Sequence, residues 1–220
     1  MTRIMTEHKD CAACGRMNTV TRVLSIYAPH GIPRGSNRFG LRSRATLMNF
    51  NCIETCKFCG YSNSLLDKFN IRKVNLIKSS EKYQSVLNNS QLNPDFKEQY
   101  LSALISEEMK YFRGAAYKYA VASSYTDDEE QKKDAIHKAI ELYEKPPISR
   151  ENLQDRLIFI DFCRRNNDFE KCKEMAEKEI EKVKNIDARE ILKTEINLCN
   201  KKESGDYFDN LFVRFICKTR

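Results

Sequence analysis

The chain has 220 residues and a formal net charge of +7, with 41% hydrophobic and 31% charged residues. This balance is typical of a soluble globular protein and excludes an intrinsically disordered chain. No apolar stretch approaches the roughly 20 residues that a membrane-spanning helix needs, and the N-terminus lacks the apolar core of a signal peptide. We therefore expect a cytoplasmic protein without a membrane partner.

Cysteine and charge are distributed unevenly, which predicts two different parts. Five of the nine cysteines lie within residues 11–59, and the other four are spread singly through the second half. Residues 1–63 carry nine Lys and Arg against three Asp and Glu, whereas the rest of the chain is nearly balanced. Because the cytosol keeps thiols reduced, a disulfide framework is not expected. We predict a small first domain over residues 1–64 and a second over 65–220.

The first domain is predicted to contain β-strands. Residues 18–27 are rich in β-branched side chains, and residues 46–54 alternate apolar side chains at period two. The prolines and glycines of residues 28–40 dictate a loop between them. The order is thus strand, loop and strand, with a cysteine pair at each end, and we expect the two strands to bring these pairs together.

The second domain is predicted to be all-α. A connector leads to a short helix capped by Ser79 or Ser80, and Asn93-Pro94 then begins a long helix. Its apolar stripe extends from Phe96 to Tyr119, which predicts one helix of about seven turns. Three helices follow, beginning at about Asp128, Ser149 and Asp168, then one from Asp187 to a stop at Gly205, and an apolar helix over residues 207–218.

The fold class expected is therefore α+β: a small β zinc ribbon followed by a larger helical array with antiparallel neighbours. Ala135 and Cys172 occupy similar positions in successive helical hairpins, 37 residues apart. Tetratricopeptide repeats have a period of 34 and small residues at such positions. We predict a tetratricopeptide-like array; a generic helical array without true repeats is the alternative.

Two cysteine pairs carry the chemistry of the sequence. Each is Cys-x-x-Cys-Gly, a turn that presents two thiolates along one edge of a metal tetrahedron. The glycine permits a positive φ, so that backbone N–H groups can turn toward the sulfurs. We predict a structural zinc ion bound by Cys11, Cys14, Cys56 and Cys59, with no open coordination position for catalysis. Loss of the metal is expected to unfold residues 1–63 and to leave the helices intact.

Other interpretations of these cysteines stay open. The pairs could form a redox dithiol or hold an iron–sulfur cluster. Cys52 could replace one ligand, although its alternation with Met48 and Phe50 favours a buried apolar role. His8 and His30 could also substitute, but their spacing to the cysteines matches no known ligand pattern. Cys163, Cys172, Cys199 and Cys217 have apolar neighbours at helical spacing and are predicted to be buried thiols.

A basic segment lies between the cysteine pairs. It contains Arg34, Arg38, Arg42 and Arg44 among glycines, with Arg16 and Arg22 nearby in the sequence. Such a segment could bind phosphate groups of a nucleic acid, or it could be solvated or face a protein. Few aromatic residues accompany it, as stacking on single strands would require.

No catalytic motif is recognised in the sequence. It has no glycine-rich phosphate loop, no nucleophile elbow and no His-Glu-x-x-His. We therefore expect a non-enzymatic adaptor that binds another protein through its helical array. The alternative function is nucleic-acid binding by the basic segment.

The layout resembles a family of uncharacterised bacterial proteins that pair an N-terminal zinc ribbon with tetratricopeptide-like helices. The resemblance rests on the stretches over residues 11–15, 25–40, 44–63 and 107–130, and the two cysteine pairs are its most specific part. It implies zinc on Cys11, Cys14, Cys56 and Cys59 and no defined activity. Members carry acidic residues and an Arg-Pro where this chain has Gly35 to Phe39. The resemblance therefore does not extend to a function of this segment.

Overall fold

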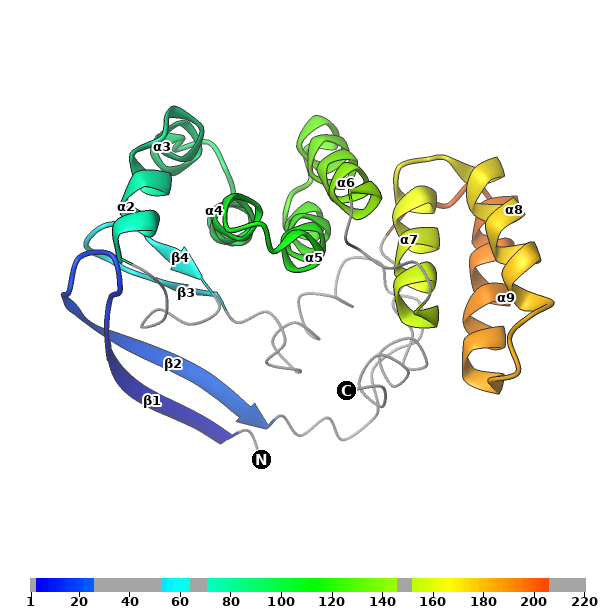
Figure 1. Ribbon diagram of the computed structural model, residues 1–220, viewed down its shortest axis with the longest axis horizontal. Coiled ribbons are helices and arrows are strands. Elements are labelled where there is room, and N and C mark those ends of the chain that lie inside the picture. Colours follow the sequence, from blue (N-terminus) through cyan, green and yellow to red (C-terminus); the bar gives the residue numbers. More distant parts are fainter. Residues whose placement is uncertain (1–2, 26–52, 64–70, 146–151, 206–220) are drawn as a thin grey trace.

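The computed structural model describes residues 3–25, 53–63, 71–145 and 152–205. Two short β-hairpins are followed by a row of helices that crosses the molecule in chain order (Figure 1). The α+β class expected from the sequence is confirmed. In these four segments no helix combines the length and the apolarity that a membrane crossing requires.

Each hairpin is built from strands that are adjacent in the sequence. In the first, β1 (Arg3–Asp10) pairs antiparallel with β2 (Met17–Ser25), and in the second, β3 (Glu54–Thr55) pairs antiparallel with β4 (Ser62–Asn63). The first of the two strands predicted between the cysteine pairs corresponds to β2, whereas residues 46–52 of the second lie outside the described residues. Each cysteine pair forms the turn of its own hairpin, and β1 was not foreseen.

The helices pack against their neighbours along the chain, so that α3 to α9 form one array. Their bounds are α2 Ile71–Ser79, α3 Glu81–Asn88, α4 Pro94–Glu108, α5 Phe112–Ala122, α6 Glu129–Glu144, α7 Leu153–Arg165, α8 Phe169–Ile180 and α9 Ile186–Asn200, with a 3-10 turn at Ser123–Tyr125. Helix α2 occupies the region that the sequence analysis treated as a connector.

Most helices begin near the residue that the sequence indicated. Ser80, Asn93 and Asp128 accept hydrogen bonds from the first free N–H groups of α3, α4 and α6, which confirms them as N-caps. Asp168 precedes α8 as expected. The Ser149 cap is wrong, because α7 begins later and is capped by Asn152.

The predicted seven-turn helix is two helices, α4 and α5. The chain leaves α4 through Lys110, whose φ of +62° reverses the backbone, while the N–H of Tyr111 donates to the carbonyl of Ser106 at 2.8 Å. Helices α7 and α9 end in the same way, at Asn167 and Lys202: the backbone has a positive φ, and the next N–H donates to the carbonyl five residues earlier. Glycine is the usual residue at such a position, and because Lys110 stands there, the sequence does not indicate that the helix ends. Helix α9 thus ends before Gly205, the predicted stop.

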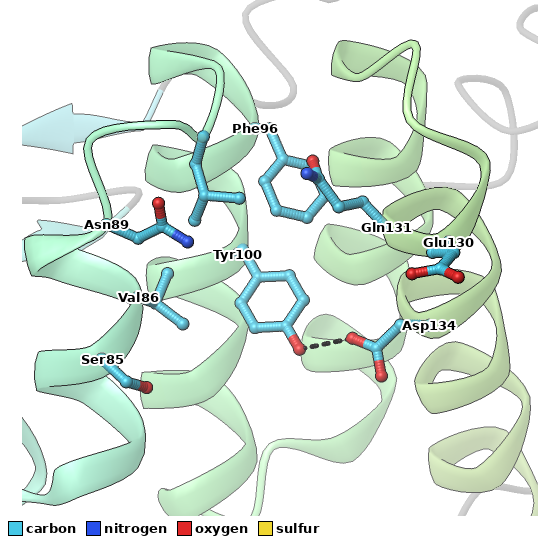
Figure 2. Close-up of a pocket in the computed structure, with 9 residues that line it drawn as sticks. Ser85, Val86, Asn89, Phe96, Tyr100, Glu130, Gln131 and Asp134 are labelled. Atoms are coloured by element: carbon cyan, nitrogen blue, oxygen red, sulfur yellow. Dashed lines mark hydrogen bonds between the residues drawn. The ribbon is translucent and has the colours of Figure 1, made fainter.

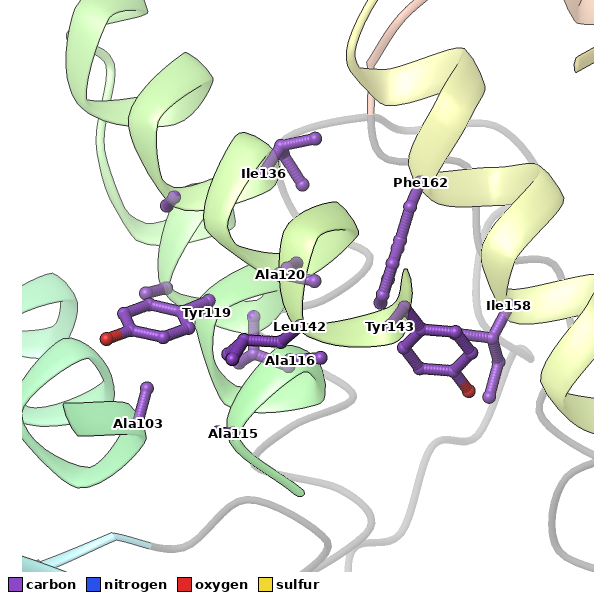
Figure 3. Close-up of a cluster of buried hydrophobic side chains, with 14 of the residues drawn as sticks. Ala103, Ala115, Ala116, Tyr119, Ala120, Ile136, Leu142, Tyr143, Ile158 and Phe162 are labelled. Atoms are coloured by element: carbon purple, nitrogen blue, oxygen red, sulfur yellow. The ribbon is translucent and has the colours of Figure 1, made fainter. Parts of the chain in front are cut away.

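The buried side chains of the hairpins and the helices form one continuous core. Figure 3 shows its central part, where alanines of α4 and α5 allow close helix packing and the Tyr143 ring meets Phe162 edge-on at 5.5 Å. Cys163, Cys172 and Cys199 are buried in the helical part, as predicted. The predicted domain boundary at residue 64, Cys217 and the helix over residues 207–218 lie outside the described residues.

The second hairpin is anchored on the helices by polar contacts as well as by this core. The Tyr83 hydroxyl donates to the carbonyl of Gly60 at 2.9 Å, and Tyr61 is fully buried. The ammonium of Lys118 donates to the side-chain oxygens of Asn63 and Ser106, at 3.2 and 2.9 Å. The second hairpin therefore belongs structurally to the helical part.

Burial lowers the pKa of the Lys118 ammonium to about 8. Because the unfolded chain then binds more protons than the folded one between pH 8 and 10.5, stability should rise with pH across that window. Between pH 7.5 and 9.5, the free energy of unfolding of the wild type should rise by about 2 kcal/mol relative to that of Lys118→Met. Urea unfolding of both proteins measures this difference, and parallel pH profiles would contradict it.

Candidate metal centre and interhelical pocket

The turns of the two hairpins bring four thiols together. The Sγ atoms of Cys11, Cys14, Cys56 and Cys59 all lie within 4.8 Å of one another. Two pairs cross between the hairpins: Cys11 to Cys59 and Cys14 to Cys56, each at 3.7 Å. A tetrahedron with metal–sulfur bonds of about 2.3 Å has edges of about 3.8 Å. These four cysteines therefore lie close enough to hold a metal ion.

Both turns have the same backbone geometry. In each, the glycine after the second cysteine donates its N–H to the carbonyl of the first, at 2.8 Å in one turn and 2.9 Å in the other. Gly15 and Gly60 have φ of +69° and +68°, which L-residues rarely adopt. The N–H of Ala13 also points at the Cys11 sulfur, at 3.4 Å. The role predicted for the two glycines is confirmed.

A buried asparagine links the two turns and was missed by the sequence analysis. The amide of Asn18 donates to the carbonyl of Arg16 at 2.8 Å and to the Cys56 sulfur at 3.4 Å, while its oxygen accepts from the N–H of Lys57 at 3.1 Å. A signal existed: both turns follow the pattern Cys-x-x-Cys-Gly-x-x-Asn, with Asn63 in the second. Asn63 is also buried, and its side-chain oxygen accepts a hydrogen bond from Lys118.

An ion pair also joins the two hairpins. The ammonium of Lys9 on β1 lies 3.0 Å from a carboxylate oxygen of Glu54 on β3, whose side chain is only 1% exposed. Lys9 also pairs with Glu7 at 3.2 Å. A buried carboxylate needs such a partner to be stable, so this pair adds to the alignment of the two turns. No spacing in the sequence indicates it.

The environment of the thiols suits metal-bound thiolates. Burial raises the pKa of the Cys11 thiol to about 12 in the absence of a cation. Burial also opposes ionisation of Cys56, but hydrogen bonds from the N–H groups of Phe58 and Cys59 and from the Asn18 amide outweigh it and lower its pKa to about 7. A bound divalent cation favours the thiolate form of every ligand. The donor set and its spacing therefore fit a tetrahedral thiolate site.

The other candidate ligands do not join this cluster, as far as the structure describes them. His8 is exposed on β1, where its Nδ1 lies 3.4 Å from the Thr19 hydroxyl. Cys52 and His30 lie outside the described residues, and so do Arg34, Arg38, Arg42 and Arg44. Arg16 is exposed beside the second turn, and its guanidinium carbon lies 5.1 Å from the centre of the Phe58 ring.

The two turn glycines provide a matched pair of substitutions. Gly15→Ala meets no atom within 4 Å and should cost only the strain of a positive φ, about 1 kcal/mol. Gly60→Ala carries the same strain, and its Cβ would lie 2.4 Å from a methyl group of Leu87, so we expect a loss of about 2 kcal/mol. Thermal unfolding of both metal-loaded variants tests this order. Equal losses would contradict the packing argument.

A pocket of about 380 Å³ opens between α3, α4 and α6 (Figure 2). Phe96 and Tyr100 of α4 form its floor, and their ring centres are 5.3 Å apart. The lining is Ser85, Val86, Asn89, Leu92, Phe96, Tyr100, Glu130, Gln131 and Asp134. The Tyr100 hydroxyl donates to the Asp134 carboxylate at 2.7 Å. Apolar groups therefore face two carboxylates across the same space.

Comparisons of the chain with protein-family models, with curated proteins and with solved structures give no significant match. The thiol cluster and the helical pocket are therefore the features of the molecule that indicate a function.

Proposed function

We propose that Cys11, Cys14, Cys56 and Cys59 hold one structural zinc ion. The support is the thiol spacing, the N–H groups that point at the sulfurs and the cross-link through Asn18. Zinc takes four thiolates in a tetrahedron without redox chemistry, and four protein ligands leave no position for a substrate. The metal would fix the first hairpin against the second, which the helices already support.

Elemental analysis of untagged protein purified without added metal tests the zinc assignment. One zinc per chain is expected. Iron with acid-labile sulfide would favour the iron–sulfur alternative, and neither metal would favour a redox dithiol. Either of these results would remove the zinc site.

We propose that the chain is a non-enzymatic cytoplasmic adaptor that binds another protein through a tetratricopeptide-like helical array. The observation that carries this proposal is the pocket between α3, α4 and α6, which offers apolar and polar groups on the outside of the array. Ala135 and Cys172 are fully buried in α6 and α8, which suits the small-residue positions of repeated helical hairpins. The resemblance to the bacterial family is part of the same proposal.

Affinity capture with the full chain tests the adaptor role. Ser85→Trp places a large ring into the pocket, whereas Ser79→Trp makes the same change at an exposed position of α2 outside it. We expect proteins from an extract of the source cell to be retained by wild type and by Ser79→Trp, and lost from Ser85→Trp. Capture of no protein, with tight binding to an oligonucleotide instead, would replace the adaptor role.

A second candidate function, nucleic-acid binding, is favoured by one surface feature of the ribbon. Phe58 is 53% exposed, with Arg16 over its ring and Lys57 adjacent in the turn. Cationic groups beside an exposed ring attract phosphate and stack on bases. Binding of a labelled mixed-sequence oligonucleotide at two salt concentrations tests it. A steep loss of affinity with salt in the wild type, together with weaker binding by Phe58→Ala at both salt concentrations, would support this function, and no binding at low salt would exclude it.

A further inference from the structure

A cationic side chain, Lys138, lies beside Tyr100, one of the two aromatic residues of the pocket floor. The ammonium of Lys138 lies 4.7 Å from the centre of the Tyr100 ring and 3.0 Å from a carboxylate oxygen of Asp134. It is also 5.9 Å from the centre of the Tyr119 ring. The same ammonium donates to the Tyr100 hydroxyl, so it lies at the hydroxyl edge of this ring and not over its face. The phenol oxygen and the carboxylate together stabilise a cation that the chain itself supplies.

A second carboxylate, that of Glu130, lines the pocket one helical turn earlier on α6. Glu130 precedes Asp134 by four residues, so both project from the same face of α6. Glu130 lines the pocket together with Phe96, and Figure 2 shows both carboxylates on the α6 side. Within the described segments, no lysine or arginine forms an ion pair with Glu130. A ring and an exposed carboxylate therefore line the same pocket, together with the Gln131 side chain.

We propose that this pocket binds a lysine or arginine side chain from an extended segment of a partner protein. The cation would lie between the Glu130 carboxylate and the Phe96 ring, and its methylene stem would cover Val86 and Leu92. The volume of about 380 Å³ lies in the lower range of ligand pockets, which suits one long side chain and its backbone. This inference rests on the proposed adaptor function and specifies the chemistry of its partner.

Other occupants fit the pocket less well. A nucleic acid would bring phosphates against Glu130 and Asp134, which repel them. A purely apolar segment would remove the Glu130 carboxylate from water without giving it a partner, which costs free energy. Charge complementarity therefore favours a basic segment.

The test uses blocked pentapeptides as probes and ¹H–¹⁵N spectra of the full metal-loaded chain as the readout. The probes are Leu-Ala-Lys-Ala-Leu, its arginine analogue, and a norleucine analogue that keeps the stem but lacks the charge. We expect saturable shifts with the lysine or arginine probe at Asn89, Glu130 and Asp134, and at least tenfold weaker binding of norleucine. Equal binding of all three, or shifts confined to other surfaces, would overturn the proposal.

Two variants with the same net charge isolate the Glu130 carboxylate. Glu130→Gln should weaken binding of the cationic probe about three- to fivefold. Glu129→Gln removes an exposed carboxylate that pairs with Lys132 and does not line the pocket, so it should leave the affinity unchanged. Equal losses of affinity in both variants would mean that the probe responds only to the net charge of the protein, which would contradict the proposed site.

The outcome is separable from that of the adaptor proposal. If protein capture depends on Ser85 but is the same for Glu130→Gln and wild type, the adaptor function stands and the cationic occupant is wrong. If no protein is captured, the adaptor function fails, and the peptide titration still decides whether the pocket prefers a cation.

Discussion

Replacing Cys56 with serine should abolish metal binding and release the first hairpin from the rest of the molecule. Cys56 supplies one of four thiols and also accepts the amide hydrogen bond of Asn18, so the substitution removes two links at once. Structural zinc sites contribute about 10 kcal/mol or more of apparent binding free energy, which becomes folding free energy for the segment they fix. Without it, the contacts described between the first hairpin and the second are the Lys9–Glu54 pair, the hydrogen bond from the Lys57 N–H to Asn18, the contact of Arg16 with the Phe58 ring and a few apolar contacts.

The loss should be confined to residues 3–25. From the sequence, all of residues 1–63 are expected to unfold, but Tyr61 is fully buried, and Gly60 and Asn63 accept hydrogen bonds from the helices. We expect hydrogen exchange to become rapid in β1 and β2, while α3 to α9 keep their protection and the metal content falls to zero.

Cys172→Ala provides the control for this experiment, because it removes a buried thiol of the helical part that lies outside the metal cluster. It should keep one metal ion per chain. If helices and first hairpin lost protection together in Cys56→Ser, the metal would be supporting the whole fold rather than one hairpin.

The second large effect concerns Arg164, a fully buried cation in α7. Its Nε donates to Glu195 at 2.7 Å and one terminal nitrogen donates to Asp161 at 2.6 Å. The other terminal nitrogen donates to the carbonyls of Glu203 and Gly205 at 2.9 and 2.8 Å. Arg164→Met would leave two buried carboxylates without this partner, and we expect the free energy of unfolding to fall by about 3–5 kcal/mol.

Urea unfolding at pH 7 measures this loss. In the double variant Arg164→Met, Glu195→Gln, part of the stability should return, because one uncompensated charge is removed. Lys178→Met breaks the exposed pair with Glu174 and should cause no measurable change. A single variant within 1 kcal/mol of wild type would mean that water reaches the two carboxylates and that the network contributes little.

The features that the sequence predicted well are those set by short-range chemistry. The Cys-x-x-Cys-Gly turns need particular residue types at fixed spacing, and so do caps such as Ser80 and Asn93. Those signals depend on a few adjacent residues and survive in any tertiary context. The thiol cluster followed from them, because two half-sites of a tetrahedron must meet.

The features that were missed depend on contacts between distant residues or on unusual residue choices. Asn18 and Glu54 act across the two hairpins, and Arg164 spans three segments of the helical part. The pairing of β2 with β1 could not be inferred, because the charged and polar side chains of residues 3–10 concealed a strand. The division between α4 and α5 depends on a lysine where glycine is usual.

Those non-glycine helix ends have a practical consequence for engineering the protein. Lys110, Asn167 and Lys202 each hold a left-handed conformation that glycine adopts without steric penalty. Substituting glycine at all three should raise the melting temperature, with about 0.5–1 kcal/mol gained per site after the entropy of the unfolded chain is included. Calorimetry of the triple variant would measure the gain. The stability of the fold can therefore be raised at three helix ends that belong neither to the thiol cluster nor to the pocket lining.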